Sequence, residues 1–157
     1  MASKAVRNSI VVMHELVLPN DTNVLGNILG GKVMHYMDIC AAMSAYKHAR
    51  SPVVTASVDR LNFLAPAKMG DILILKSSVN YTGNTSMEVG VRIESENTIS
   101  GEINHTASAY LTFVSLDDKR KPKHVAIINP ETKNELRRFK QAEVRKEIRK
   151  SRLKNIT

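Results

Sequence analysis

The sequence predicts an α+β domain in which one antiparallel sheet packs against one long helix. A stretch at 32–50 carries apolar residues at three- and four-residue spacing, and four segments with a period of two follow it. Short turns join those four segments, and short connections favour antiparallel pairing. We therefore expect a sheet that curls around a buried helix, followed by a C-terminal helical extension.

Residue type and spacing predict where each strand and the helix begin and end. Residues 8–18 are apolar and end at Pro19, so we expect a first strand there. A polar loop then leads through Gly30 and Gly31 to the helix, which is apolar over most of its circumference and should be buried on several sides. The later strands, rich in β-branched residues or alternating in polarity, are expected at 53–64, 71–79, 85–95 and 104–116.

The chain changes character after residue 116. A charged linker at 117–123 precedes Asn129, Pro130 and Glu131, which form a favourable helix start of cap, proline and first-turn acid. We expect a polar helix over 131–154 whose apolar residues form no clear stripe. The chain is accordingly divided into a domain at 1–125 and a basic C-terminal helical extension at 126–157.

Composition narrows the class of protein. The chain has 157 residues, 43% of them hydrophobic and 24% charged, which suits one globular domain and excludes collagen-like or wholly disordered chains. A single cysteine, Cys40, excludes a disulfide framework and is typical of a reducing compartment. No apolar stretch approaches the roughly 20 residues of a membrane span. We expect a soluble cytoplasmic protein with no membrane partner.

The net charge of +8 is confined to one part of the chain. Residues 1–116 contain nine Lys/Arg and nine Asp/Glu, whereas residues 117–157 contain fourteen and six. The basicity therefore belongs to the extension. A solvated helix without a partner explains such a run most simply, and nucleic-acid binding explains it least well because no base-reading module is present and Phe139 is its one aromatic residue.

The junction between loop and helix carries the most chemical information. Adjacent Gly30 and Gly31 allow close approach to the backbone, and the free amides of a helix start favour developing negative charge. Two turns further on, Asp38 is a carboxylate amid methionine and alanine. An amide pocket with a carboxylate is what acyl transfer requires. A purely structural explanation fits the same pattern equally well. In that case the glycines only relieve a tight turn, and the aspartate has a structural role.

Segment 19–38, PNDTNVLGNILGGKVMHYMD, resembles the signature of the hotdog-fold acyl-CoA thioesterases of the cytosolic acyl-CoA hydrolase family. Segments 53–59, 62–71 and 109–116 resemble the same family, and the match spans roughly 9–125. The resemblance implies hydrolysis of acyl-CoA thioesters to free acid and CoA, with no metal or other cofactor. It also implies a homodimer with active sites at the interface, assembled into a trimer of dimers, that is, a hexamer.

The resemblance assigns roles to individual residues. Asp38 would be the catalytic carboxylate, and Asn27 would act with it from the partner subunit. Gly30 or Gly31 would donate an amide to the thioester carbonyl. Thr55 and Ser57 lie in a strand of the matching segments and would border the thioester, unless they are ordinary strand residues. Lys119, Arg120 and Lys121 would attract the phosphates of CoA, which is the second explanation of the basic extension.

The histidines, the cysteine and the methionines give weaker indications of function. The five histidines show no metal-ligand spacing, and Cys40 should be plain core. Met34, Met37 and Met43 should be core residues or line an acyl pocket. The alternative function is a non-catalytic hotdog protein that binds acyl-CoA or nucleic acid through its basic extension.

Overall fold

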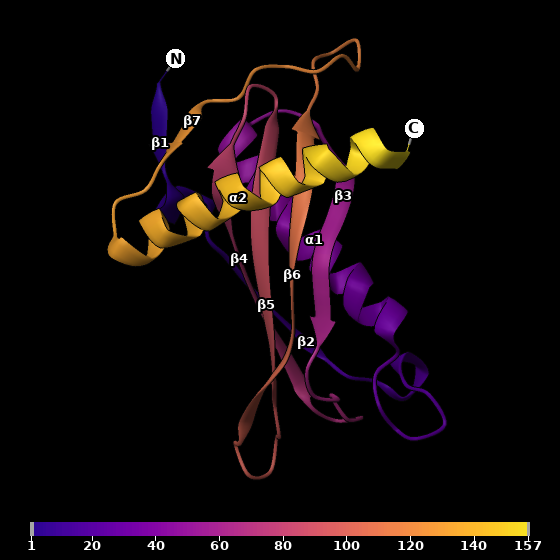
Figure 1. Cartoon of the computed structure of the whole chain (residues 1–157). Coiled ribbons are helices and arrows are strands. Elements are labelled where there is room, and N and C mark those ends of the chain that lie inside the picture. Colours follow the sequence, from indigo (N-terminus) through magenta and orange to yellow (C-terminus); the bar gives the residue numbers. More distant parts are fainter. Residues whose placement is uncertain (1, 157) are drawn as a thin grey trace.

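A computed structural model describes residues 2–156, which form a five-stranded sheet, a two-stranded sheet and two α-helices (Figure 1). The helices are α1 (Gly30–Ala49) and α2 (Lys133–Ile156). The strands are β1 (Ser3–Ala5), β2 (Val11–Leu16), β3 (Val53–Phe63), β4 (Ile72–Thr82), β5 (Ser86–Glu96), β6 (Ile103–Ser115) and β7 (Ile127–Asn129). Short 3-10 turns at Val6–Ser9 and Pro19–Asp21 flank β2.

The larger sheet has the strand order β2-β4-β5-β6-β3, and all of its pairs are antiparallel. The expected α+β class and the order of one strand, one long helix and four further strands are confirmed. α1 lies on one face of the sheet, and α2 crosses the other face (Figure 1). Within residues 2–156, no further strand pairs with the outer edge of β2 or of β3.

The main core lies between α1 and the sheet. Alternate residues of β4, β5 and β6 are buried on the α1 side, and α1 contributes Val33, Met37, Cys40, Ala41 and Ala45. The prediction that Cys40 is core is confirmed. Met34 and Met43, in contrast, remain 44% and 37% exposed, so they are not core residues of the single chain.

α2 lies against the sheet, which corrects the interpretation of the extension as a solvated helix. Ala142 is fully buried, and the ring centres of Phe139 and Tyr81 are 5.0 Å apart. Arg145 lies over the ring of Tyr110 at 3.5 Å from its centre. The apolar pattern did not predict this contact because an arginine supplies much of it, burying its aliphatic stem and stacking its guanidinium.

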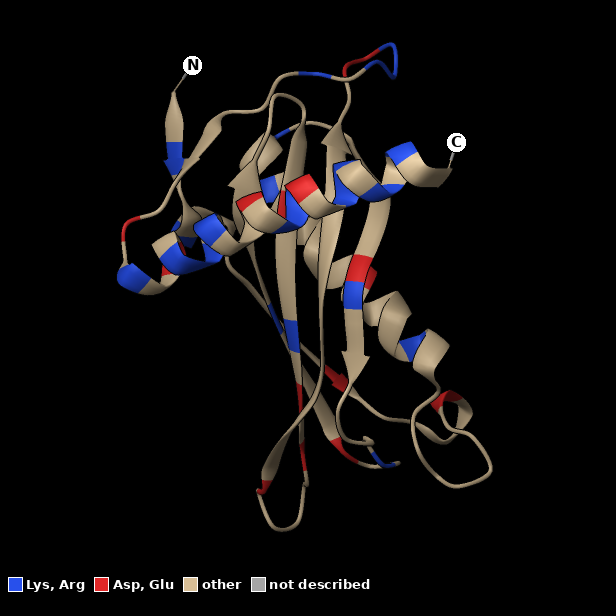
Figure 2. Cartoon of the chain, in the orientation of Figure 1, with Lys and Arg blue, Asp and Glu red and all other residues tan. Residues whose placement is uncertain are grey.

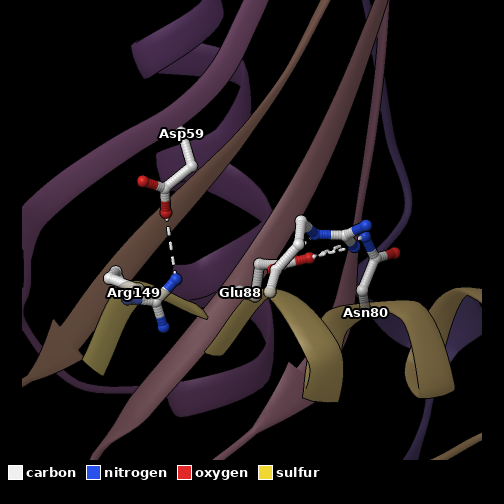
Figure 3. A network of polar contacts seen from close by, with 5 residues as sticks. Asp59, Asn80, Glu88 and Arg149 are labelled. Atoms are coloured by element: carbon white, nitrogen blue, oxygen red, sulfur yellow. Dashed lines mark hydrogen bonds and ion pairs between the residues drawn. The ribbon is translucent and has the colours of Figure 1, made fainter. Parts of the chain in front are cut away.

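An ion pair beneath α2 joins the helix to β5 (Figure 3). Arg145 donates two hydrogen bonds, of 3.0 and 2.7 Å, to the carboxylate of Glu88, whose side chain is 4% exposed. Asn80 donates a further one of 3.3 Å to the same carboxylate. A second, more exposed pair joins Arg149 to Asp59 on β3 at 2.9 Å. Paired arginines therefore fix α2 on the sheet at two points.

The start of α2 differs from the prediction. Asn129 does not cap a helix, because it pairs with Ala5 in the small parallel sheet of β1 and β7, which sequence analysis did not predict. The helix begins at Lys133, and Thr132 and Glu135 form its capping box. The Thr132 hydroxyl accepts from the Glu135 N–H at 3.1 Å, and the Glu135 carboxylate accepts from the Thr132 N–H at 3.2 Å.

His48, near the end of α1, holds the segment before β7. Its Nε2 lies 2.6 Å from the carbonyl oxygen of Ala126, and Lys4 donates to the carbonyl of His48 at 2.7 Å. Burial is the main cause that lowers the pKa of His48 below 6.5, since it disfavours the charged ring. In the part of the chain described, neither helix combines the length and apolar character needed to cross a membrane.

Candidate active site

Asp38 lies where α1 passes the edge strand β3. Its carboxylate accepts a 2.6 Å hydrogen bond from the hydroxyl of Thr55. Asp38 is half-buried and Thr55 is exposed. One hydrogen bond fixes the direction of the carboxylate and leaves further lone pairs for water or a substrate. The pair therefore has the geometry of a carboxylate that can serve as a base or as a nucleophile.

The start of α1 is an open donor site. Residue Gly30 begins the helix directly after Leu29, and no side chain of the described residues caps that end. The first amides of a helix lack partners within it, and the helix dipole favours negative charge there. A Cβ added at Gly31 would meet nothing within 4 Å, so the backbone is open to an approaching molecule. These amides can stabilise a carbonyl oxygen on which charge develops.

A cavity of about 390 Å³ opens beside this helix start. Its lining consists of Ile28, Gly30, Val33, Phe63, Leu64, Ala65, Pro66, Ala67 and Thr106. Thr106 is the one residue of this lining with a polar side chain, and a mostly apolar lining is typical of small-molecule sites. The segment 64–67 that follows β3 forms one wall. Sequence reasoning did not assign Thr106 or this wall to the site, because periodicity encodes neither the bend after β3 nor the bulge at Thr106 in β6.

Asn27 lies in the loop before α1, where it is half-buried and forms a β-bridge with Lys68. The same loop depends on Asn23, whose Oδ1 accepts hydrogen bonds from the N–H groups of Leu25 and Asn27 at 2.9 and 3.2 Å. The positive φ of Gly26, +78°, completes the turn, and glycine adopts it without strain. Sequence analysis treated Asn23 only as part of a polar loop.

Within one chain, Asp38 is far from the helix start. Eight positions separate it from Gly30 along α1, and at 1.5 Å per residue they span about 12 Å. Reacting groups must approach to about 3–3.5 Å. The carboxylate and the amide of the same chain therefore cannot act on the same carbonyl group.

The structure does not bring Ser57 to Asp38. Ser57 pairs with Thr112, which in turn pairs with Glu88, the carboxylate covered by α2. The side chains of these three paired residues lie on the face of the sheet opposite α1. A bulge in β3 between Thr55 and Ser57 accounts for the difference, because it breaks the simple alternation along the strand.

The basic residues Lys119, Arg120 and Lys121 are exposed in a tight turn after β6. Asp117 holds the turn, since its Oδ1 accepts from the N–H groups of Lys119 and Lys121 at 2.8 and 2.9 Å. The turn lies at the end of the sheet away from the start of α1 (Figure 1). Basic residues also follow α2 along its length, as Figure 2 shows.

The described residues contain neither a metal-binding cluster nor an activated thiol. Across residues 2–156, no cluster of His, Cys, Asp and Glu could hold a metal ion. Cys40 donates from Sγ to the Ser77 hydroxyl at 3.3 Å, and burial raises the pKa of its thiol. This thiol is therefore a core group rather than a nucleophile.

Comparisons with known proteins place the chain in a family. The family model described as the thioesterase superfamily matches residues 25–102. An uncharacterized acyl-CoA thioester hydrolase of Bacillus subtilis, YkhA, is 40% identical over 93% of this chain and 85% of its own length. Protein VdlD of Helicobacter pylori is 36% identical over 88% of this chain and 79% of its own length. The architecture is thus the hotdog fold, and the chain belongs to the thioesterase superfamily.

Solved structures of acyl-CoA thioesterases and hydrolases have the same fold as this chain. An apo-hexameric acyl-CoA thioesterase superposes with a TM-score of 0.94 at 47% identity, over 98% of both chains. An acyl-CoA hydrolase from Staphylococcus aureus, in complex with butyryl coenzyme A and coenzyme A, gives 0.91 at 41% identity, over 98% of this chain and 93% of the other. Further structures of that hydrolase have an aspartate, an asparagine or a threonine replaced by alanine.

Proposed function

We propose that the chain hydrolyses acyl-CoA thioesters to the free carboxylic acid and CoA. The observation that carries this proposal is the Asp38 carboxylate, oriented by the Thr55 hydroxyl at the edge of the sheet. Relatives named as acyl-CoA thioester hydrolases, and the Staphylococcus aureus hydrolase bound to butyryl coenzyme A, support the substrate class. Water is the other reactant, so the proposed reaction transfers no electrons and needs no redox cofactor.

The proposed reaction uses one hydrogen-bond donor, a backbone amide, and one carboxylate. An amide at Gly30 or Gly31 donates to the thioester oxygen as it gains negative charge. Asp38 either takes a proton from the water that attacks the carbonyl, or attacks the carbonyl itself to give an anhydride that water then cleaves. In both cases the C–S bond breaks, and the CoA thiolate leaves and gains a proton.

The site is proposed to be built by two chains. About 12 Å separate Asp38 from Gly30 in one chain, so the amide that acts with Asp38 comes from a partner subunit. Apolar side chains are exposed along the free edge of β3 and on the side of α1 that carries Asp38, including Val58 and Met34, which are 43% and 44% exposed. Pairing along this surface would bury them. A trimer of such dimers is our proposal for the full assembly, by analogy with the hexameric relative.

The asparagine of the site is Asn27 or Asn23. In the Staphylococcus aureus hydrolase, the substituted asparagine precedes the substituted aspartate by 15 positions, and the threonine follows it by 17. In this chain Asn23 precedes Asp38 by 15 positions, and Thr55 follows by 17. The spacing supports Asn23, whereas the sequence resemblance supports Asn27. Separate Asn23→Ala and Asn27→Ala variants decide between them, because only the residue that contacts substrate should lower kcat strongly.

The basic turn is proposed to attract the phosphates of CoA through Lys119, Arg120 and Lys121.

A cytoplasmic location is proposed as well, in line with relatives named cytosolic acyl coenzyme A thioester hydrolase. The alternative function, acyl-CoA or nucleic-acid binding without catalysis, draws support only from the positive charge of the extension.

Release of CoA thiol from butyryl-CoA tests the proposal. Asp38→Asn keeps the shape of the side chain but removes the base, so kcat should fall about 100- to 10,000-fold while the oligomer stays intact. Glu147→Gln, on the exposed side of α2, is the matched control and should leave kcat unchanged. Full activity in Asp38→Asn would contradict the assignment. Salt-dependent RNA or DNA binding without thiol release would favour the alternative.

A further inference from the structure

A second cavity, of about 400 Å³, opens on the face of the sheet that α2 crosses (Figure 1). Paired residues of three neighbouring strands form its floor, and these are Lys76, Ser78, Gly90, Arg92, Ser108 and Tyr110. Arg138 of α2 forms part of its wall. A volume of this size is typical of small-molecule sites. The sheet separates this cavity from Asp38 of the same chain, which lies on α1 at the opposite face.

Gly90 makes the floor of this cavity hollow. It lies in the interior of β5, the central strand of the sheet, and its pairing with both neighbouring strands is regular. A glycine there weakens a strand and often marks close approach of a ligand or of another group. The amide of Asn80 takes one end of the space, since a Cβ at Gly90 would lie 2.7 Å from its Nδ2. The rest of the space belongs to the cavity.

The charge of the cavity is positive. Lys76, Arg92 and Arg138 line it, and no acidic side chain does so among the described residues. Glu94 lies beside the cavity, 2.8 Å from the Lys76 ammonium and 3.6 Å from the Nε of Arg92, so it offsets one of the three charges. Within residues 2–156, Arg138 forms no ion pair. The Glu88 carboxylate on the same face is already paired beneath α2.

These polar groups are accessible from outside the molecule. The side chains of Lys76 and Arg92 are each 52% exposed, and Arg138 is exposed as well. Ser78 and Ser108 on the floor are half-buried, so their hydroxyls lie within reach of a molecule in the cavity. A ligand can therefore contact the cations and the hydroxyls without any movement of the core.

We propose that this cavity is a second ligand site, separate from the Asp38 site, which binds a small molecule that carries phosphate groups. A phosphate monoester has a charge of about −1.5 to −2 at neutral pH, and an arginine guanidinium binds it through two parallel hydrogen bonds. Arg92 approaches from β5 and Arg138 from α2, so the phosphates would join the helix to the sheet. Hydrolysis of thioesters is not needed for this binding.

The ligand is a nucleotide rather than a free phosphate ion. The cavity has room for more than phosphate groups, and the part of its lining without charge includes the side chain of Ile10 and the ring of Tyr110. Such surfaces suit the sugar and the base of a nucleotide, because aromatic rings and apolar side chains contact bases irrespective of their sequence identity.

Isothermal titration calorimetry of the full chain with ADP, GDP, CDP and UDP tests the proposal. At least one of them should bind and raise the Tm by a few degrees. Arg92→Gln and Arg138→Gln should each weaken that binding about tenfold or more, while the Tm without ligand stays close to wild type because both residues are exposed. Arg137→Gln is the matched control. It removes the same charge from the neighbouring position of α2, which does not line the cavity, and should change the Kd by about twofold or less.

Two further titrations identify the site and the ligand. With CoA at saturation, the Kd of the nucleotide should be unchanged, whereas loss of binding would place the nucleotide in the substrate site and overturn the proposal. Pyrophosphate should bind more weakly than the best nucleotide, and equal affinity would contradict a nucleotide ligand. Absence of binding by all four nucleotides, or a Kd that neither arginine substitution changes, would also overturn the proposal. None of these measurements uses thiol release, so their failure would leave the proposed function intact.

Discussion

Thr55 donates a 2.6 Å hydrogen bond to Asp38, so a residue of the sheet edge sets the direction of the carboxylate on the helix. Hydrogen bonds to charged groups are stronger than neutral ones. Thr55→Val should therefore lower kcat about tenfold with a smaller effect on KM. Thr55→Ser, which retains the hydroxyl, should restore most of the loss. Steady-state thiol release measures both, and an unchanged kcat in Thr55→Val would show that the bond does not serve catalysis.

A site shared between chains predicts complementation. Coexpression of Asp38→Asn with a variant that lacks the catalytic asparagine, Asn23→Ala or Asn27→Ala, should yield mixed dimers with one intact site. Random pairing should then restore about a quarter of wild-type activity, although each variant alone is inactive. Coexpression of two chains that both carry Asp38→Asn is the control. If the mixture were no more active than its parents, the site would lie within a single chain.

The two ion pairs of α2 should differ in their contribution to stability. Arg145→Met leaves the buried Glu88 carboxylate unpaired, which should lower the free energy of unfolding by about 3–5 kcal/mol and the Tm by about 10 °C. Arg149→Met breaks a more exposed pair and should cost about 1 kcal/mol or less. Thermal unfolding of both variants checks this, and similar Tm values would contradict the role of burial.

His48 predicts a loss of stability in mild acid. Its pKa in the folded chain lies below 6.5, so the unfolded chain binds more protons as the pH falls through that value. Stability is therefore retained above about pH 6.5 and declines below it, down to the folded pKa. His48→Gln should flatten the decline in urea midpoints between about pH 7 and pH 5.5. His124→Gln, at an exposed position, should not flatten it.

The basic turn predicts a salt-dependent KM. Replacing Lys119, Arg120 and Lys121 together by Gln should raise KM for butyryl-CoA several-fold at low salt and leave kcat unchanged, because exposed charges attract phosphates at long range. The difference from wild type should shrink as ionic strength rises. A KM equal to that of wild type at low salt would remove these residues from the substrate site.

Local patterns predicted much of the fold. The helix, the later strands and their antiparallel order follow from periodicity and short turns, and the structure moves their ends by only a few residues. Patterns of this kind failed where a contact joins distant segments. Asn129 has the residue type of a cap but lies in a parallel pair with β1, 124 positions earlier in the chain.

The residues of the candidate site also fall into those that the sequence could identify and those that it could not. Asp38, Gly30 and Gly31 could be identified because a carboxylate in an apolar helix and a glycine pair before it are unusual locally. The Thr55 hydrogen bond, the bulge at Thr106 and the α2-side position of Ser57 could not. Each depends on a strand irregularity or on packing between elements, and single-sequence periodicity contains neither.

The buried pair of Glu88 and Arg145 limits the routes by which this sequence can change over evolutionary time. A substitution of either residue alone passes through an intermediate with a solitary charge beneath α2. Replacement of both residues by apolar side chains would be tolerated. It requires two substitutions, and the second must occur while the destabilised single variant still persists in the population. Drift at these two positions should therefore occur in concert, whereas the exposed positions of α2 are free to diverge singly.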